Sequence, residues 1–263
     1  MPELPDVETF RRYLDATSLH QRIRRAVVEA PELVHGVSAR RLRRILAGQA
    51  LASSERHGKY LFGALESDGW LVLHFGMTGG LAYSKLDKPL PRHTRLWLEF
   101  DNGYRLAYRS QRKLGRIALT GDPRAYAAER GLGPDALDPE LDLERFRALM
   151  AKRRGKVKGV LMDQGLIAGI GNIYADEVLF QAGIRPTTRV DAMGDEDVSR
   201  LYDAMRSTLQ ATIEAQADPE QMPEGFLLPQ RHQDGRCPRC GRALARVRVS
   251  GRTSYYCPRC QPA

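Results

Sequence analysis

The sequence lacks long apolar runs: none of its 263 residues belongs to a stretch of roughly 18 uncharged apolar residues, the length that a membrane-spanning helix needs. The first ten residues, MPELPDVETF, carry acids where a secretory signal peptide carries basic residues, and no apolar segment follows them. Internal repeats and low-complexity segments are also missing. These absences predict a protein that neither spans a membrane nor is secreted, with a cytoplasmic location.

Cysteine is scarce and confined to the last 27 residues, where four cysteines form two CxxC pairs. Cys237 and Cys240 are separated by 16 residues from Cys257 and Cys260, a span that suits a β-hairpin bringing both pairs together. Four thiolates in this pattern favour one structural Zn²⁺ in a closed tetrahedral site. The alternative is two redox or disulfide pairs. A module of this size has too small a core to fold without such support.

Acidic residues are fewer than basic ones, 32 against 41, which gives a formal net charge of +9. Eight arginines and one acid lie between Arg231 and Ala263, and five of the seven residues from Lys152 to Lys158 are basic. Such clusters favour a polyanionic partner such as nucleic acid, although solvated arginine faces are the alternative. The basic run from Arg40 to Arg44 is interpreted as a solvated face. A hydrophobic content of 42% excludes global disorder.

The first half of the chain predicts a helix followed by antiparallel strands. Pro5 and Asp6 suit a first helical turn, and Val7, Phe10 and Leu14 recur at helical spacing. Short segments rich in β-forming residues come next, at 22–29, 69–75, 95–100, 104–109 and 116–120. Asn-Gly at 102–103 is a strong hairpin signal between two of them. These patterns predict a sandwich or barrel.

The second half predicts helices at 141–151, 157–164, 173–181 and 195–217, with linkers at 131–139 and 218–230. The chain is therefore expected to be α+β, with a helix-led β domain over residues 1–130, a helical domain over 131–230 and a zinc hairpin over 231–263. Arg252 lies at the expected tip of that hairpin, where a guanidinium can grip a phosphate in bidentate fashion.

The amino terminus offers a possible nucleophile. If Met1 is removed, the chain begins with Pro2, whose nitrogen is a secondary amine. An α-amino group has a pKa of roughly 7.7–8.0, so on the order of a tenth is neutral at pH 7. Attack on a sugar aldehyde carbon would form an iminium that acidifies the adjacent proton, with Glu3 beside it as acid or base. The alternative is a plain helix lead-in.

Three features together resemble the formamidopyrimidine-DNA glycosylase and endonuclease VIII family. They are the start MPELPDVE, the segment LMDQGLIAGIGNIYADEVLFQAG at 161–183, and the terminal four-cysteine hairpin. The resemblance covers nearly the whole chain, and the motifs occur in the family's order. It implies an N-terminal helix and antiparallel β-sandwich, a helical domain with a helix–two-turn–helix motif, and a C4 zinc-finger hairpin. It also implies one structural zinc, no organic cofactor, and a nucleoid-associated monomer acting on damaged or abasic double-stranded DNA.

The resemblance implies a base-excision repair reaction in which a damaged base is flipped out of the stack. The N-terminal proline then displaces the base through a Schiff base, and β/δ-elimination nicks the strand. Pro2 matches the nucleophile and Glu3 the assisting acid. Lys59 matches a lysine that contacts phosphate and serves in elimination, although alone it is a surface lysine at a strand start. Arg252 matches the zinc-finger arginine that holds the phosphates of the lesion.

The resemblance also implies DNA-contacting residues. Apolar wedges and a side chain for the orphaned base are implied in two glycine-flanked loops, and phosphate contacts are implied in basic stretches and in a turn before a helix. The implied wedges are Met77 and Leu114, whose alternative is core packing, with Arg112 for the orphaned base; the implied backbone contacts are His93, Arg153, Lys158 and Asn172. Read alone, His93 is a surface histidine and Asn172 a helix cap.

Two departures from the family concern the lesion. The second loop more often has Pro and Phe where Gln111 and Leu114 stand here. The segment 211–236 lacks the Gly-rich, Ser/Thr-containing loop that covers a flipped oxidised purine in members that remove 8-oxoguanine. Oxidised pyrimidines, hydantoins or bulkier lesions are therefore candidate substrates. Two alternatives to an enzyme are a protein that binds damaged or abasic DNA without cutting it and an RNA- or ribosome-binding protein, neither of which needs Pro2, Glu3 and Lys59 together.

Overall fold

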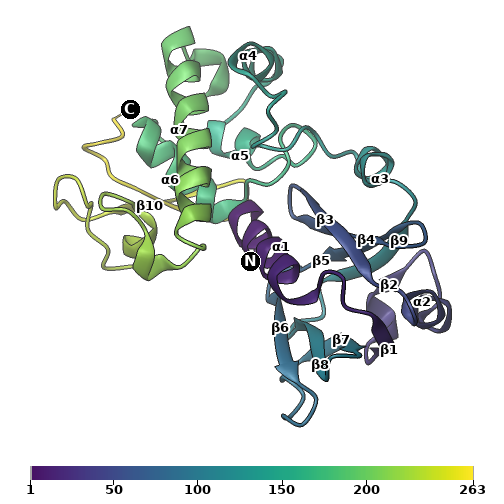
Figure 1. Cartoon of the computed structure of the whole chain (residues 1–263). Helices are drawn as coiled ribbons and strands as arrows, with labels where there is room; N and C mark the ends of the chain where they lie inside the picture. Colours follow the sequence, from purple (N-terminus) through teal and green to yellow (C-terminus); the bar gives the residue numbers. More distant parts are fainter. Residues whose placement is uncertain (1, 263) are drawn as a thin grey trace. The chain divides into compact units, whose positions relative to one another are not determined.

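The computed structural model describes residues 2–262 (Figure 1). The chain forms two compact units: Pro2 and residues 6–130 belong to the first, and residues 3–5 and 131 onwards to the second. Met1, whose removal the amine chemistry requires, lies outside the described residues. None of the helices within residues 2–262 is long and apolar enough to cross a membrane.

The first unit is a β-sandwich led by a helix. The predicted first helix is confirmed as α1, Leu4–Ser18, and it buries Val7 and Leu14 in the core between the sheets. One sheet has the order β1-β7-β8-β6 and the other the order β2-β9-β5-β4-β3. The strands are β1 Ile23–Val28, β2 Val34–His35, β3 Leu51–His57, β4 Tyr60–Leu65, β5 Trp70–His74, β6 Gly79–Lys85, β7 Thr94–Phe100, β8 Tyr104–Ser110 and β9 Arg116–Thr120.

The antiparallel sandwich predicted from the sequence is confirmed. Among the named strands of the described residues, only β2 and β9 pair in parallel. The turn between β7 and β8 is the predicted Asn-Gly hairpin, and Gly103 adopts a φ of +82°, which favours glycine. Helix α2, Ala39–Leu46, buries Leu42 and Leu46 and leaves Arg40, Arg41, Arg43 and Arg44 exposed, as the solvated-face interpretation requires. Helix α3 spans Pro123–Glu129.

The second unit is a helical bundle joined to a hairpin. Its helices are α4 Leu143–Ala151, α5 Val157–Leu161, α6 Asn172–Ala182 and α7 Asp195–Glu214. Helix α6 contacts both α7 and the hairpin, and it buries even its two acids, Asp176 and Glu177. It ends at Gly183, which takes the left-handed conformation that commonly closes a helix. The helices predicted in this half are confirmed with shifts at their ends.

The hairpin pairs β10, Ala245–Val249, with β11, Arg252–Tyr256. The segment 218–230 that precedes it is not a free linker. Short 3₁₀ turns at Pro219–Gln221 and Leu228–Gln230 shape it, and the backbone N–H groups of Leu227 and Leu228 donate to the Glu177 carboxylate at 3.0 and 2.6 Å. Leu227 is fully buried with Phe180 beside the cysteines, so the segment is fixed on α6.

Candidate active site and metal centre

Glu3 lies at the amino end of α6. Its carboxylate accepts hydrogen bonds from the backbone N–H groups of Gly171 at 2.8 Å, Ile173 at 3.0 Å and Tyr174 at 3.2 Å. Glu3 is fully buried. An anion is stabilised there because the N-terminal N–H groups of a helix have no partner within the helix and the helix dipole is positive at that end. The amides that the sequence assigned to a phosphate therefore hold a carboxylate of the chain itself.

A close backbone approach sets this arrangement. The N–H of Leu4 donates to the carbonyl of Gly169 at 3.0 Å. A Cβ at Gly169 would lie 2.5 Å from the Leu4 side chain, and its φ of +118° is a conformation that other residues rarely adopt. Glycine at 169 is thus what lets the segment carrying Glu3 meet the turn before α6. Pro2, bonded directly to Glu3, is half-buried.

Lys59 lies in the tight turn between β3 and β4, next to Gly58, which has a φ of +55°. Arg56 closes this turn because its Nη1 donates to the Gly58 carbonyl at 3.2 Å, and its Nε donates to Glu8 at 3.2 Å. Glu8 also pairs with Arg11 at 2.7 Å. Burial alone would raise the pKa of Glu8. The hydrogen bond and the charge of Arg11 oppose this effect, and the resulting pKa is lowered. The Lys59 turn is therefore anchored to α1.

The two loops assigned to wedge residues contact each other. Arg112 donates from Nη1 to Met77 Sδ at 3.1 Å and from its backbone N–H to Thr78 Oγ1 at 3.1 Å. Leu114 is 50% exposed, an unusual position for a large apolar side chain. A Cβ at Gly76 would lie 2.5 Å from the Leu114 carbonyl, so glycine there permits the two loops to pack closely. Met77 is half-buried and Leu114 projects from the sandwich core.

His93 and His74 differ in environment. His93 is exposed, with a φ of +63°. His74, which the sequence analysis left unassigned, ends β5, and burial is the main cause that lowers its pKa to about 4, helped by the charge of Lys59. Its neutral Nδ1 accepts a 3.4 Å hydrogen bond from the Gly76 N–H, so His74 supports the Met77 loop.

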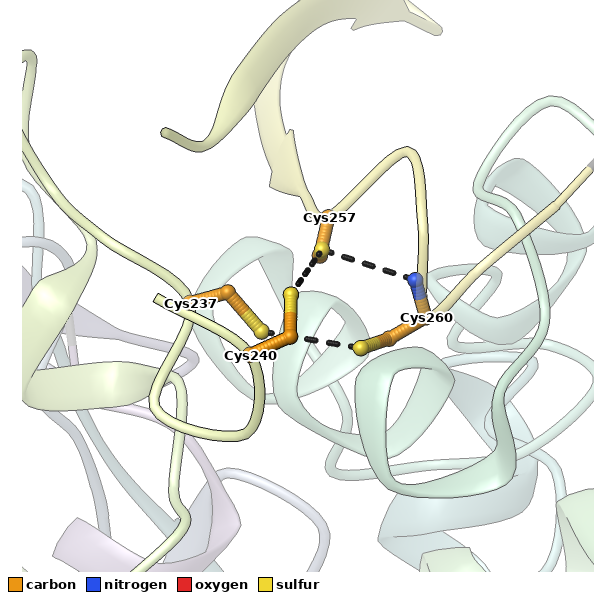
Figure 2. A group of neighbouring side chains, drawn as sticks. All are labelled: Cys237, Cys240, Cys257 and Cys260. Carbon is orange, nitrogen blue, oxygen red and sulfur yellow. Dashed lines mark hydrogen bonds between the residues drawn. The ribbon is translucent and has the colours of Figure 1, made fainter. Parts of the chain in front are cut away.

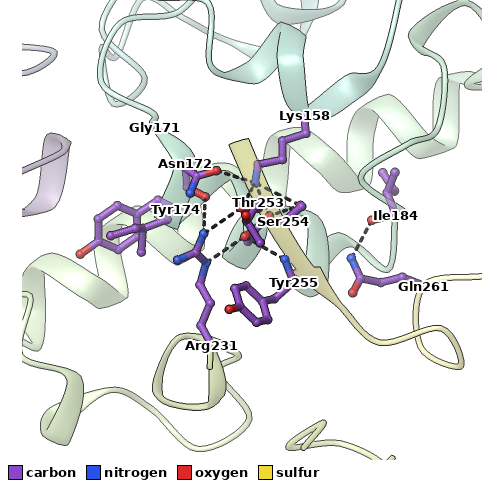
Figure 3. A network of polar contacts seen from close by, with 12 residues as sticks. Lys158, Gly171, Asn172, Tyr174, Ile184, Arg231, Thr253, Ser254, Tyr255 and Gln261 are labelled. Carbon is purple, nitrogen blue, oxygen red and sulfur yellow. Dashed lines mark hydrogen bonds and ion pairs between the residues drawn. The ribbon is translucent and has the colours of Figure 1, made fainter. Parts of the chain in front are cut away.

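Of the basic residues assigned to DNA in the second unit, Arg252 and Arg153 reach solvent and Lys158 is buried. Arg252 is exposed at the hairpin tip, next to Gly251 with its φ of +74°, and Arg153 is half-exposed with a 3.7 Å ion pair to Asp163. Lys158 was expected to face DNA, but its side chain points into the interior. Its ammonium is fully buried and donates to Asn172 Oδ1 at 2.7 Å (Figure 3). Burial lowers the pKa of Lys158, and the charge of Asp176 opposes that effect.

The four cysteines converge on one point (Figure 2). Their sulfur atoms all lie within 4.8 Å of one another. Cys237 and Cys260 sulfurs are 3.7 Å apart, and those of Cys240 and Cys257 are 3.5 Å apart, so no disulfide joins them. A tetrahedral ion with Zn–S bonds of about 2.3 Å requires sulfur separations of about 3.8 Å. The donor set and its dimensions therefore fit one structural zinc, and the disulfide alternative is wrong.

Sequence reasoning missed Asp176 and Arg231. Asp176 is a fully buried carboxylate on α6, and Arg231 donates to it from Nε at 2.8 Å. The available signal was two adjacent acids in an otherwise apolar helix, in a unit with an excess of arginine. Burial of a carboxylate requires paired cations or hydrogen bonds, so such acids indicate an internal network.

The chain matches three family models in order. Residues 1–117 match the formamidopyrimidine-DNA glycosylase N-terminal domain, 132–223 the formamidopyrimidine-DNA glycosylase H2TH domain, and 235–263 the zinc finger found in FPG and IleRS. A curated relative, the formamidopyrimidine-DNA glycosylase of Geobacter metallireducens, is 37% identical over 99% of this chain and 100% of its own length.

Solved structures agree with these matches. Lactococcus lactis formamidopyrimidine-DNA glycosylase, bound to DNA containing an AP site, superposes with a TM-score of 0.91 at 31% identity, over 99% of this chain and 100% of the other. A structure of MutM with DNA containing carbocyclic 8-oxo-G gives a TM-score of 0.90 at 31% identity, with both chains fully covered. This chain therefore belongs to the formamidopyrimidine-DNA glycosylase family of repair enzymes, which combine DNA glycosylase and AP lyase activities.

Proposed function

We propose that this base-excision repair enzyme removes a damaged base from duplex DNA with the nitrogen of Pro2 as nucleophile, and that it acts as a cytoplasmic monomer. The observation that carries the assignment is the fixed position of Glu3. Its carboxylate is held by the three N–H groups of the α6 turn, so the residue bonded to Pro2 is immobilised. Preorganisation of this kind keeps a nucleophile and its acid in one geometry.

In the proposed reaction, the neutral Pro2 nitrogen attacks C1′ of the damaged nucleoside, and the base departs and takes a proton from water. The N–H proton of Pro2 passes to the Glu3 carboxylate. The bond between nitrogen and C1′ then becomes an iminium as the sugar ring opens. The iminium draws electrons from C2′, so a proton leaves C2′ and the 3′ phosphate departs; a second elimination releases the 5′ phosphate. Glu3 hands the proton it received from Pro2 to the ring oxygen as the ring opens. As a carboxylate again, it accepts the proton that leaves C2′.

The remaining assigned residues bind and hold the strand. Lys59, on its anchored turn, and Arg252, at the hairpin tip, are proposed to contact the phosphates that flank the lesion. Met77 and Leu114 fill the space that the flipped nucleotide leaves, and Arg112 faces the orphaned base. His93, Arg153 and the amide of Asn172 are proposed to contact the DNA backbone. Zinc supplies no chemistry to these steps; when bound, it holds the hairpin folded.

Borohydride trapping tests the proposal. The purified protein is mixed with a duplex that contains one abasic site, and borohydride is added to reduce the iminium to a stable amine. The expected result is a covalent protein–DNA band whose yield falls to background in Pro2→Gly, while that variant still binds the duplex. Binding without trapping or nicking by the wild-type protein would instead support the non-catalytic alternative.

The lesion is a separate question. Solved relatives hold DNA with 8-oxo-G or an AP site. Segment 218–230 of this chain contains a single glycine, Gly225, and its Leu227 and Leu228 are fixed on Glu177. We propose that the preferred substrates are lesions that need no covering loop, namely oxidised pyrimidines and hydantoins. Single-turnover excision from a panel of duplexes, each with one lesion, is expected to rank these above 8-oxoguanine. The reverse ranking contradicts the lesion assignment and leaves the trapping result intact.

A further inference from the structure

A buried carboxylate links two of the proposed phosphate-binding groups, although it contacts neither itself. Asp176 is fully buried on α6 and accepts four hydrogen bonds. Lys158 Nζ at 2.7 Å and Ser254 Oγ donate to Oδ1. The Tyr255 backbone N–H at 3.1 Å and Arg231 Nε at 2.8 Å donate to Oδ2. These donors come from α5, β11 and the segment before the cysteines, so one carboxylate joins three parts of the second unit.

One branch of this network runs to Asn172. Lys158 Nζ donates to Asn172 Oδ1 at 2.7 Å, as Figure 3 shows. An ammonium has three donors and no acceptor, so the amide oxygen has to face Lys158. The Nδ2 group of Asn172 is consequently turned away from Lys158 and remains a donor for another acceptor. Asp176 holds the ammonium in this place, because burial alone disfavours a charged Lys158.

The second branch runs to the hairpin tip. The carbonyl of Thr253 accepts hydrogen bonds from Arg231 Nη2 at 3.3 Å and from Lys158 Nζ at 3.4 Å. The next two residues of β11 bond to Asp176 through the Ser254 hydroxyl and the Tyr255 N–H. Arg252 immediately precedes this fixed stretch. Its backbone is therefore set by the network, while its side chain remains exposed.

We propose that Asp176 is a positioning residue that couples Asn172 and Arg252, so that both present their donors to the DNA backbone as one preformed unit. This inference rests on the proposed function, which assigns DNA contacts to both side chains. It also gives Lys158 a role that matches its burial: the ammonium orients Asn172 from behind and does not touch DNA. Removal of the Asp176 charge leaves the cations of Lys158 and Arg231 buried without their shared anion.

A double-mutant cycle tests the coupling. The affinity for a duplex with one tetrahydrofuran abasic analogue is measured for Asp176→Asn, Asn172→Ala, Arg252→Ala and the two double variants. We expect Asp176→Asn to bind about tenfold more weakly, a loss of the size that decoupled network residues show. Asn172→Ala and Arg252→Ala should then each cost less than about twofold in the Asp176→Asn background.

Glu177→Gln is the matched control. Glu177 is the neighbouring buried carboxylate on α6, and it accepts backbone N–H groups from Leu227 and Leu228 instead. This variant is expected to lose thermal stability while the effects of Asn172→Ala and Arg252→Ala stay at full size. Melting temperature and zinc content are measured for every variant, so a general loss of structure is separated from lost coupling.

The outcomes distinguish the inference from the function beneath it. If Asn172→Ala and Arg252→Ala bind as the wild-type protein does, the proposed DNA contacts are wrong. If each weakens binding but both remain additive with Asp176→Asn, the contacts stand and the coupling is overturned. Should Asp176→Asn lose zinc or cooperative unfolding, Lys158→Met replaces it, because this change removes the donor that orients Asn172 Oδ1 and keeps the pair of Asp176 with Arg231. Additivity of Lys158→Met with Asn172→Ala overturns the proposal equally.

Discussion

Arg112 Nη1 lies 3.1 Å from Met77 Sδ, which joins two loops separated by 35 residues in the sequence. The backbone N–H of Arg112 also donates to Thr78. The proposed wedge, Met77, and the side chain proposed for the orphaned base, Arg112, are therefore held together by direct contacts.

This contact predicts that Met77→Ala and Arg112→Ala are not additive. Each is expected to slow base release, and the double variant should fall short of the sum by about 0.5–1 kcal/mol, since contacting residues share their interaction energy. Lys113→Ala is the control in the same loop, because Lys113 pairs with exposed Glu32 at 2.6 Å and such pairs contribute little. Additive effects of Met77→Ala and Arg112→Ala in single-turnover assays argue against this coupling.

Glu3→Gln is predicted to lower the rate of base release by about 10²–10⁴-fold, the usual range for loss of an acid–base group. Duplex affinity should change little. Glu177→Gln is the control, since it neutralises another buried carboxylate bonded to backbone N–H groups. A wild-type rate of base release in Glu3→Gln removes this residue from the chemistry and leaves it as a helix cap.

The lowered pKa of His74 predicts that the free energy of unfolding depends on pH. Its pKa is lowered from 6.5 to about 4, mainly by burial. Between about pH 6.5 and pH 4, His74 is protonated in the unfolded protein but not in the folded protein. The free energy of unfolding therefore falls as the pH drops through this range. His74→Gln should reduce this fall by about 2–3 kcal/mol, from the size of the shift. Urea unfolding at both pH values measures it, with exposed His232→Gln as control; equal slopes for wild type and His74→Gln refute the prediction.

Cys240→Ser is predicted to lose zinc and DNA affinity together. The protein should fall from one zinc per chain to none, because three thiolates no longer close the tetrahedron. Affinity should drop at least as far as in Arg252→Ala, about 1.5–3 kcal/mol for a charged hydrogen bond, since the hairpin carries that residue. Zinc measured at one per chain in this variant would contradict the four-cysteine site.

The features that the sequence predicted correctly depend on residues close together in the chain. The two CxxC pairs, the Asn-Gly hairpin and the helical spacing after Pro5 each act within a few residues, and all are confirmed. Strand β3, with the sequence LASSERH, was missed because its residues lack β-branched side chains. Pairing with β4 holds it in the sheet, and such tertiary contacts override local preference.

Sequence patterns did not reveal the contacts between residues that are far apart in the chain. Glu3 bonds to residues about 170 positions away, and no local pattern specifies that meeting. Lys158 was assigned to DNA because it matches a basic, DNA-facing stretch of the family, yet its ammonium is buried against Asp176. A cluster of basic residues in the sequence shows only that cations are present. Which of their side chains face solvent depends on the fold.

The most direct test of Pro2 as the nucleophile is to locate the trapped sugar on the polypeptide. The wild-type complex with an abasic duplex is reduced with borohydride, digested with nuclease and protease, and analysed by tandem mass spectrometry. The proposed mechanism places the deoxyribose remnant on the nitrogen of Pro2 in a chain that lacks Met1. A remnant on Lys59 or another lysine, or Met1 still bonded to Pro2 in active protein, would contradict it.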